Sequence, residues 1–318
     1  MTECQVRDSV RQIDEDSWLI ANEFIICRQA VASFGSLWGD NNGYHYTVIA
    51  APYPTPATTT LPSNSPIQLV HDAGDASAVW AFGGAFLKFK LIPVDMRNVT
   101  KEVTTLKWLA EHGSFTFAVP KVLHYMEEKD RSYLLISRVE GEVLADVWRT
   151  ISEEEKLRCA SRIFDICREL SSCRSNEITG IDGAELPDTW LSADPSTKNF
   201  QPQYLQQTCE QMGMHSSTFY MWHNDLGPYN IIIDRRNGSL GLIDWEMAGY
   251  VPLDWIRTKF GVSWAMDFAW PGVGDEALRE WRSYVERRFA EEEYPEVKAA
   301  WRARFNEKSI SLRSRSMG

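Results

Sequence analysis

Three oxygen-bearing side chains in the C-terminal half have the types and spacing that phosphate chemistry needs. Asp225 lies five residues before Asn230, Asp244 follows fourteen residues after Asn230, and Gly227-Pro228 indicates a turn that returns the Asp225 carboxylate toward Asn230. A carboxylate can accept a proton from a hydroxyl, while amide and carboxylate oxygens ligate a hard cation such as Mg2+. Together they indicate phosphoryl transfer to an alcohol.

A β-hairpin is predicted to position two of these residues. The apolar runs 231–233 and 240–243 flank Asn237-Gly238, a pair strongly favoured in two-residue hairpin turns. In that register Ile231 faces Asp244, and Asn230 lies about 5–8 Å from Asp244 as a diagonal neighbour. Taken singly, each residue also fits an ordinary role: Asp225 capping a turn, Asn230 beginning a strand and Asp244 ending one.

Two segments carry a family resemblance. H-N-D-L-G-P-Y-N-I (223–231) and G-L-I-D-W-E (241–246) resemble the catalytic and metal loops of the aminoglycoside phosphotransferase-like family, in its fungal branch. The resemblance implies an α+β, two-lobed protein-kinase-like fold with a small antiparallel-sheet N-lobe and a mainly helical C-lobe. It makes Asp225 the catalytic base, Asn230 and Asp244 the metal ligands, and His223 a structural support of the loop, with ATP and Mg2+ as cofactors.

The same segments bear on the acceptor. Asn224 and Gly227 stand where bacterial members usually have glycine and histidine, so the acceptor need not be an aminoglycoside. Trp245 and Glu246 follow Asp244 where protein kinases continue D-F-G, and no A-P-E follows. This favours the hydroxyl of a small molecule over a polypeptide. A pseudokinase or nucleotide-binding module and a kinase acting on protein remain the alternatives.

Strands are predicted over 67–70, 77–82 and 85–90, followed by a helix with Thr100 as its N-cap. Alternation puts Lys88 and Lys90 on one face of the third strand. The resemblance implies that Lys88 binds the phosphates, with Lys90 as the alternative, and that Glu102 orients the lysine. The alternatives are a solvated edge-strand lysine and a glutamate that only favours the helix dipole.

Adenine is expected to bind at residues 137–141, which follow a further predicted strand. The resemblance makes 137–141 the hinge between the lobes, and its backbone amide and carbonyl groups, around Ser137 and Val139, pair with adenine. The sequence itself shows only an apolar strand that ends before Gly141. No G-x-x-x-x-G-K motif occurs, which excludes a P-loop.

Amino-acid composition limits the classes of partner and the cellular location that we expect. The 318 residues are 44% hydrophobic, and the net charge of −11 argues against nucleic-acid partners while permitting a cationic acceptor. Six cysteines without a C-x-x-C pair indicate reduced intracellular thiols. The sequence shows neither a secretory leader nor an apolar run of about 18 residues, so we expect a cytoplasmic protein without a membrane span. Oligomeric state is not visible.

Four segments are expected. Residues 1–66 form an N-terminal extension with a Pro/Thr-rich connector, 67–137 the nucleotide-binding N-lobe, 138–305 the catalytic and acceptor-binding C-lobe, and 306–318 a mobile tail. The apolar residues before position 50 are expected to pack on the first lobe. Tryptophans beyond the hairpin are expected in the core, although a cage with Asp267 for an amine is an alternative.

Overall fold

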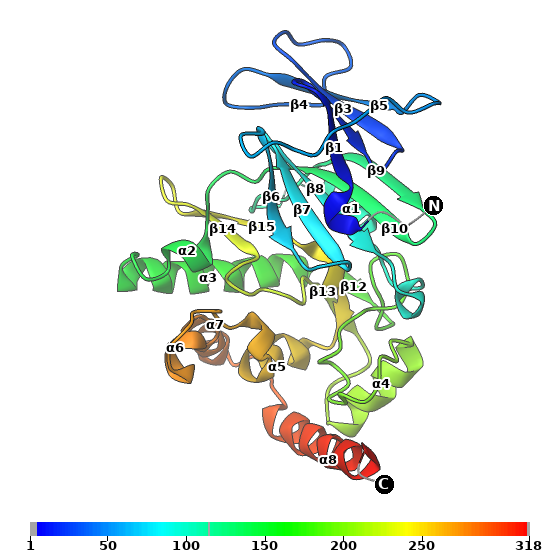
Figure 1. The fold of residues 1–318 in the computed structure, drawn as a ribbon. Helices are drawn as coiled ribbons and strands as arrows, with labels where there is room; N and C mark the ends of the chain where they lie inside the picture. Colours follow the sequence, from blue (N-terminus) through cyan, green and yellow to red (C-terminus); the bar gives the residue numbers. More distant parts are fainter. Residues whose placement is uncertain (1–4, 114, 317–318) are drawn as a thin grey trace. The chain divides into compact units, whose positions relative to one another are not determined.

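The computed structural model describes residues 5–113 and 115–316 (Figure 1). The chain forms two compact units, one from Met1–Val94 with Pro120–Arg138 and one from Asp95–Val119 with Val139–Gly318. The first consists of antiparallel sheets, and helices dominate the second. This confirms the predicted α+β class of the kinase-like fold. In the described ranges, no helix is long and apolar enough to cross a membrane.

The first unit contains two five-stranded antiparallel sheets. One has the order β1-β2-β3-β5-β4, with strands β1 (Val10–Asp14), β2 (Ser17–Ile20), β3 (Phe24–Gln29), β4 (Trp38–Gly39) and β5 (His45–Ala50). The other has the order β6-β7-β8-β10-β9, with strands β6 (Ile67–Asp72), β7 (Ser77–Phe82), β8 (Ala85–Leu91), β9 (Val122–Glu128) and β10 (Arg131–Ser137).

Residues before position 50 pack against the second sheet. Trp18 meets Phe82 edge to face at 6.1 Å between ring centroids, and Trp38 donates its indole N–H to the Phe82 carbonyl over 2.8 Å. One buried hydrophobic cluster joins both sheets. The sequence predicts this packing but not the sheet itself, because short strands with mixed apolar and polar residues resemble a loop-rich extension.

The strand alternation predicted for the second sheet is observed. Leu87 and Phe89 are fully buried, whereas Lys88 and Lys90 on the opposite face are partly exposed. β8 is the central strand of the sheet, so Lys88 is not an edge-strand residue. Its neighbours across the sheet are Val79 and Leu134.

The second unit contains two three-stranded sheets, β11-β14-β15 and β12-β13-β16. Their strands are β11 (Glu142–Val143), β12 (Arg174–Ser175), β13 (Phe219–Trp222), β14 (Ile231–Asp234), β15 (Ser239–Leu242) and β16 (Gly249–Val251). The helices are α1 (Glu102–Glu111), α2 (Leu144–Val147), α3 (Glu153–Leu170), α4 (Pro202–Gln211), α5 (Leu253–Val262), α6 (Asp275–Leu278), α7 (Glu280–Glu291) and α8 (Lys298–Ser316).

One helix begins where the sequence predicts, and two others lie in segments that were expected to be irregular or mobile. The capping box that Ser152 and Glu155 predicted is present at the start of α3, with Ser152 Oγ accepting from the Glu155 amide. By contrast, α4 lies in the region 174–215 that was expected to be irregular. α8 continues to Ser316, through most of the segment expected to be a tail.

Helix α1 belongs by its contacts to the second unit, although 67–137 was expected to form one lobe. It packs against the short helix η3 (Trp245–Met247). Thr100, the expected N-cap, instead donates its hydroxyl to Asp182 Oδ1 over 2.5 Å, and its amide donates to the Glu185 carbonyl over 3.0 Å. These long-range bonds hold the start of α1 on the loop at 180–185.

Candidate active site

The hairpin β14–β15 exists, but its register differs from the predicted one. Ile231 pairs with Leu242 rather than Asp244, and Asp234 pairs with Ser239, so the turn has four residues instead of two. The reason is the Asp234 side chain, which accepts from the amide and guanidinium of Arg236 and from Asn237 Nδ2. These local bonds compete successfully with the two-residue turn.

The corrected register places Asn230 opposite Ile243, whose amide donates to the Asn230 carbonyl over 3.0 Å. Asp244 therefore lies one residue beyond the paired strands. Its backbone is left-handed, with φ +65°, a conformation that costs energy for any residue except glycine. Such outliers persist where surrounding contacts enforce them, which is typical of functional sites.

His223 holds the loop that carries Asp225. Its ring nitrogen Nδ1 accepts from the Asp225 amide over 3.2 Å, and Nε2 lies 2.9 Å from the Ile243 carbonyl oxygen. Because a carbonyl can only accept, Nε2 carries the proton and the imidazole is neutral. His223 thereby connects the loop at 223–230 to the end of the hairpin beside Asp244.

Asp225 and Asn230 are in direct contact. Asn230 Nδ2 donates to Asp225 Oδ2 over 2.9 Å and to the Asp225 backbone oxygen over 3.0 Å. Since both bonds use the amide nitrogen, the Asn230 oxygen is the atom that can ligate a cation. Burial raises the pKa of Asp225 to about 6; the Lys259 charge opposes this rise, and Asp244 adds to it.

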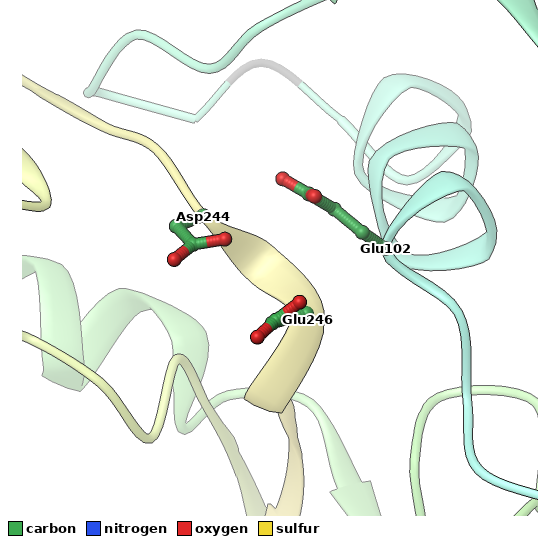
Figure 2. Close-up of side chains that lie close together, drawn as sticks. All are labelled: Glu102, Asp244 and Glu246. Carbon is green, nitrogen blue, oxygen red and sulfur yellow. The ribbon is translucent and has the colours of Figure 1, made fainter. Parts of the chain in front are cut away.

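Three carboxylates gather around the end of the hairpin. Glu102, Asp244 and Glu246 can each place an oxygen within 4.8 Å of the others. Figure 2 shows Glu102 reaching from α1 toward the segment that carries Asp244 and Glu246, and Glu102 Oε1 accepts from the Trp245 amide over 3.2 Å. Such hard oxygen donors fit Mg2+, which prefers carboxylates, phosphates and water. Glu246 was not assigned a role from the sequence.

The two expected hinge residues differ in their surroundings. The Ser137 amide donates to the Lys121 carbonyl, and Ser137 Oγ accepts from the Lys121 amide, each over 2.9 Å. The Ser137 N–H is thus already engaged within its own unit. Val139 packs on β15, where a Cβ at Gly241 would lie 2.4 Å from Val139 Cγ1. Lys88 lies in the first unit, and Glu102, Asp225, Asn230 and Asp244 lie in the second.

The model of the phosphotransferase enzyme family matches residues 69–291 of this chain. The chain belongs to the phosphotransferase enzyme family. Every residue discussed above as a candidate for the site lies inside the matched range, and family membership supports a transferase of the kinase type. The N-terminal sheet β1–β5 and all of α8 lie outside it.

Solved structures similar to this phosphotransferase-family chain have low sequence identity. Aminoglycoside phosphotransferase APH(3'')-Id from Streptomyces rimosus is 19% identical over 77% of this chain and 90% of that chain, with a TM-score of 0.47. The bifunctional kinase-methyltransferase WbdD is 16% identical over 80% of this chain and 48% of that chain, with a TM-score of 0.36. Curated protein sequences show no match. Similarity at this level says nothing about the substrate of this family member.

Proposed function

We propose that this protein transfers the γ-phosphate of ATP, with Mg2+, to a hydroxyl of a small molecule, and that Asp225 is the catalytic base. The observation that carries the proposal is the Asp225–Asn230 pair, joined over 2.9 Å. The Asp225 carboxyl is close enough to feel the charge of Asp244, which groups with Glu102 and Glu246. A base beside an oxygen-rich cation site is the arrangement that phosphoryl transfer to an alcohol requires.

Asp225 suits the role of base by its orientation and its pKa. Asn230 Nδ2 holds one carboxylate oxygen, and the Asp225 amide is tied to His223, so the carboxylate has a defined direction. Burial raises its pKa to about 6, which makes it a stronger base than an ordinary aspartate while leaving it ionised at neutral pH. Asp225 would take the proton from the acceptor hydroxyl as the oxygen attacks phosphorus.

Asn230 and Asp244 are the proposed metal ligands, and Glu246 offers a further carboxylate oxygen. Bound Mg2+ would supply positive charge to the phosphate oxygens. The chain's own contribution is to fix the ligand oxygens: Asn230 through its bonds to Asp225, and Asp244 through its left-handed backbone at the end of the hairpin. Lys88 and Glu102 are proposed to act on the phosphates as a lysine and its orienting partner, with Ser137 and Val139 near adenine.

The acceptor is proposed to be a small-molecule alcohol. Asp267 was a candidate for binding a cationic acceptor. Its carboxylate instead accepts from both Nε and Nη2 of Arg282, so its charge is already neutralised and the case for a cationic acceptor is weaker. The fungal branch of the family and a cytoplasmic location are part of this proposal. Streptomycin and ADP are bound in one similar structure, that of APH(3'')-Id, and describe that enzyme.

Thermal unfolding with ATP, with and without Mg2+, tests the proposal on native protein and on Asp244→Ala. A ligand at about 100 times its dissociation constant adds about 2.7 kcal/mol, which raises the midpoint by a few degrees in a protein of this size. We expect a Mg2+-dependent rise for the native chain and none for Asp244→Ala. Glu276→Ala, which removes an exposed carboxylate on α6, is the matched control and should keep the rise.

A turnover assay separates the alternatives. Native protein with MgATP should release ADP, and Asp225→Asn should release far less while still showing the thermal shift. Binding without turnover would favour a nucleotide-binding module, and the absence of any shift with ATP would contradict the proposed function.

A further inference from the structure

A buried ion pair lies under the loop at 223–230. Lys259 on α5 is 1% exposed, and its Nζ lies 2.8 Å from Oδ2 of Asp188, whose side chain is fully buried. Asp188 also accepts from the Trp255 indole over 2.8 Å and from the Trp190 amide over 3.0 Å. A charge so deeply buried is tolerated only when it is paired and hydrogen-bonded, and both conditions are met here.

The second bond of the ammonium reaches the loop itself. Lys259 Nζ donates to the backbone carbonyl of Asn224, the residue immediately before Asp225. Asn224 has a left-handed backbone, with φ +64°, and is fully buried. Neither polar atom of its side chain has a hydrogen-bond partner among the residues that the structure describes. The Asn224 side chain therefore does not hold its own backbone in this uncommon conformation, whereas Lys259 does.

The neighbouring peptides have different supports. His223 accepts from the Asp225 amide, and the Trp281 indole donates to the Leu226 carbonyl over 2.9 Å. The carbonyl of Asn224 lies between these two anchors. A single side chain that must bond both a carboxylate and a carbonyl needs at least two donors, and the ammonium of a lysine has three.

We propose that Lys259, held by Asp188, is a positioning residue that fixes the Asn224–Asp225 peptide and thereby aims the Asp225 carboxylate. This rests on the proposed function for its catalytic consequence. The geometric part does not, because it concerns only how the loop at 223–230 is held. Lys259 itself touches neither the acceptor nor the phosphates in this proposal.

Three variants of the full chain test the positioning role. Lys259→Met removes the ammonium and keeps the length of the side chain, and the double variant Asp188→Asn with Lys259→Met also removes the carboxylate that would be left unpaired. Lys298→Met is the matched control, since Lys298 pairs with Glu286 in the same unit. Each is compared with native protein by circular dichroism and by its thermal midpoint.

The kinetic readout is hydrolysis of MgATP by water to ADP and phosphate, without an added acceptor. A misdirected base should lower kcat by about 10 to 100-fold, because small displacements of a reacting group are costly. KM for ATP should stay within about 2-fold, because the loop carbonyl is not part of nucleotide binding. Lys298→Met should match the native kcat. A folded double variant with native kcat would overturn the proposal.

Hydrogen exchange of the protein without nucleotide or metal gives a readout that needs no activity. The Asp225 and Asn230 amides, which are bonded within the loop, should exchange at least about 10-fold faster in the double variant than in Lys298→Met, while α3 and α5 keep their rates. If native protein does not turn over ATP, the proposed function fails and this measurement still decides the positioning role. Unchanged loop exchange, or a double variant that cannot fold, counts against it.

Discussion

The side-chain amide of Asn230 donates to both the carboxylate and the backbone oxygen of Asp225, over 2.9 and 3.0 Å. One nitrogen therefore fixes the direction of the proposed base, while the oxygen of the same amide remains the candidate ligand for a cation. The proposed base and the proposed metal site are therefore coupled through a single residue. A change at Asn230 should consequently disturb both functions, which most other changes in the loop would not.

Asn230→Ala is expected to lower MgATP turnover by about 100-fold or more, because it removes an orienting hydrogen bond and a metal ligand together. The affinity for Mg2+ should fall in parallel. Initial rates over a Mg2+ titration measure both effects. Asn237→Ala, at the turn of the same hairpin, should leave both unchanged, and near-native turnover in Asn230→Ala would argue that Asp225 needs no such partner.

Asp225→Asn is expected to stabilise the metal-free protein at alkaline pH. The folded-state pKa of Asp225 is raised from 3.8 to about 6, so its favourable contribution is complete below pH 3.8 and is lost as the pH rises through 6. Above pH 6 the native protein holds a buried carboxylate, and the variant avoids a penalty of about 1 to 3 kcal/mol. Urea unfolding in EDTA at pH 5 and pH 8 measures the difference.

The gain from Asp225→Asn should be larger at pH 8 than at pH 5. Asp234→Asn is the control of opposite sign, since Arg236 lowers the pKa of Asp234 and its charge is favourable in the folded state. Equal effects of Asp225→Asn at both pH values would show that the carboxylate is not penalised by burial.

Glu246→Gln is expected to weaken Mg2+ binding by about 10-fold if Glu246 supplies a ligand or orders one, a loss typical of changes close to a metal. Asp244→Asn should weaken it further, since Asp244 is the proposed direct ligand. Isothermal titration of the ATP complex with Mg2+ compares the two variants. Glu276→Gln, on α6, controls for the loss of one negative charge, and native affinity in Glu246→Gln would limit the site to Asn230 and Asp244.

Gly180→Ala is expected to destabilise the second unit by about 1 to 3 kcal/mol or more through overpacking. A Cβ at Gly180 would lie 1.6 Å from Thr100 Oγ1 and 2.3 Å from Thr100 Cβ, so the segment leading into α1 would have to move. Because Glu102 lies just beyond Thr100, MgATP turnover should fall as well. Gly274→Ala, where the added Cβ meets nothing within 4 Å, should unfold at nearly the native urea concentration.

Local patterns in the sequence were sufficient to predict several structural elements. Alternation on β8 placed Lys88 opposite the buried face, and the spacing of Ser152 and Glu155 predicted the start of α3, because both features depend on residues a few positions apart. The existence of the hairpin followed from its apolar runs for the same reason. Its register did not, since the side chain of Asp234 chose a four-residue turn over the two-residue turn.

Only the tertiary structure brought together residues that are distant in the chain. Glu102 reaches the Trp245 amide across 143 positions, and Lys259 meets Asp188 across 71. No periodicity encodes such pairs, because they depend on how separate elements pack. The sequence by itself determined which side chains are the candidates for the proposed chemistry, namely Asp225, Asn230 and Asp244. Packing decided how these groups are held, because a buried charge or an uncommon backbone conformation persists only where distant residues satisfy it.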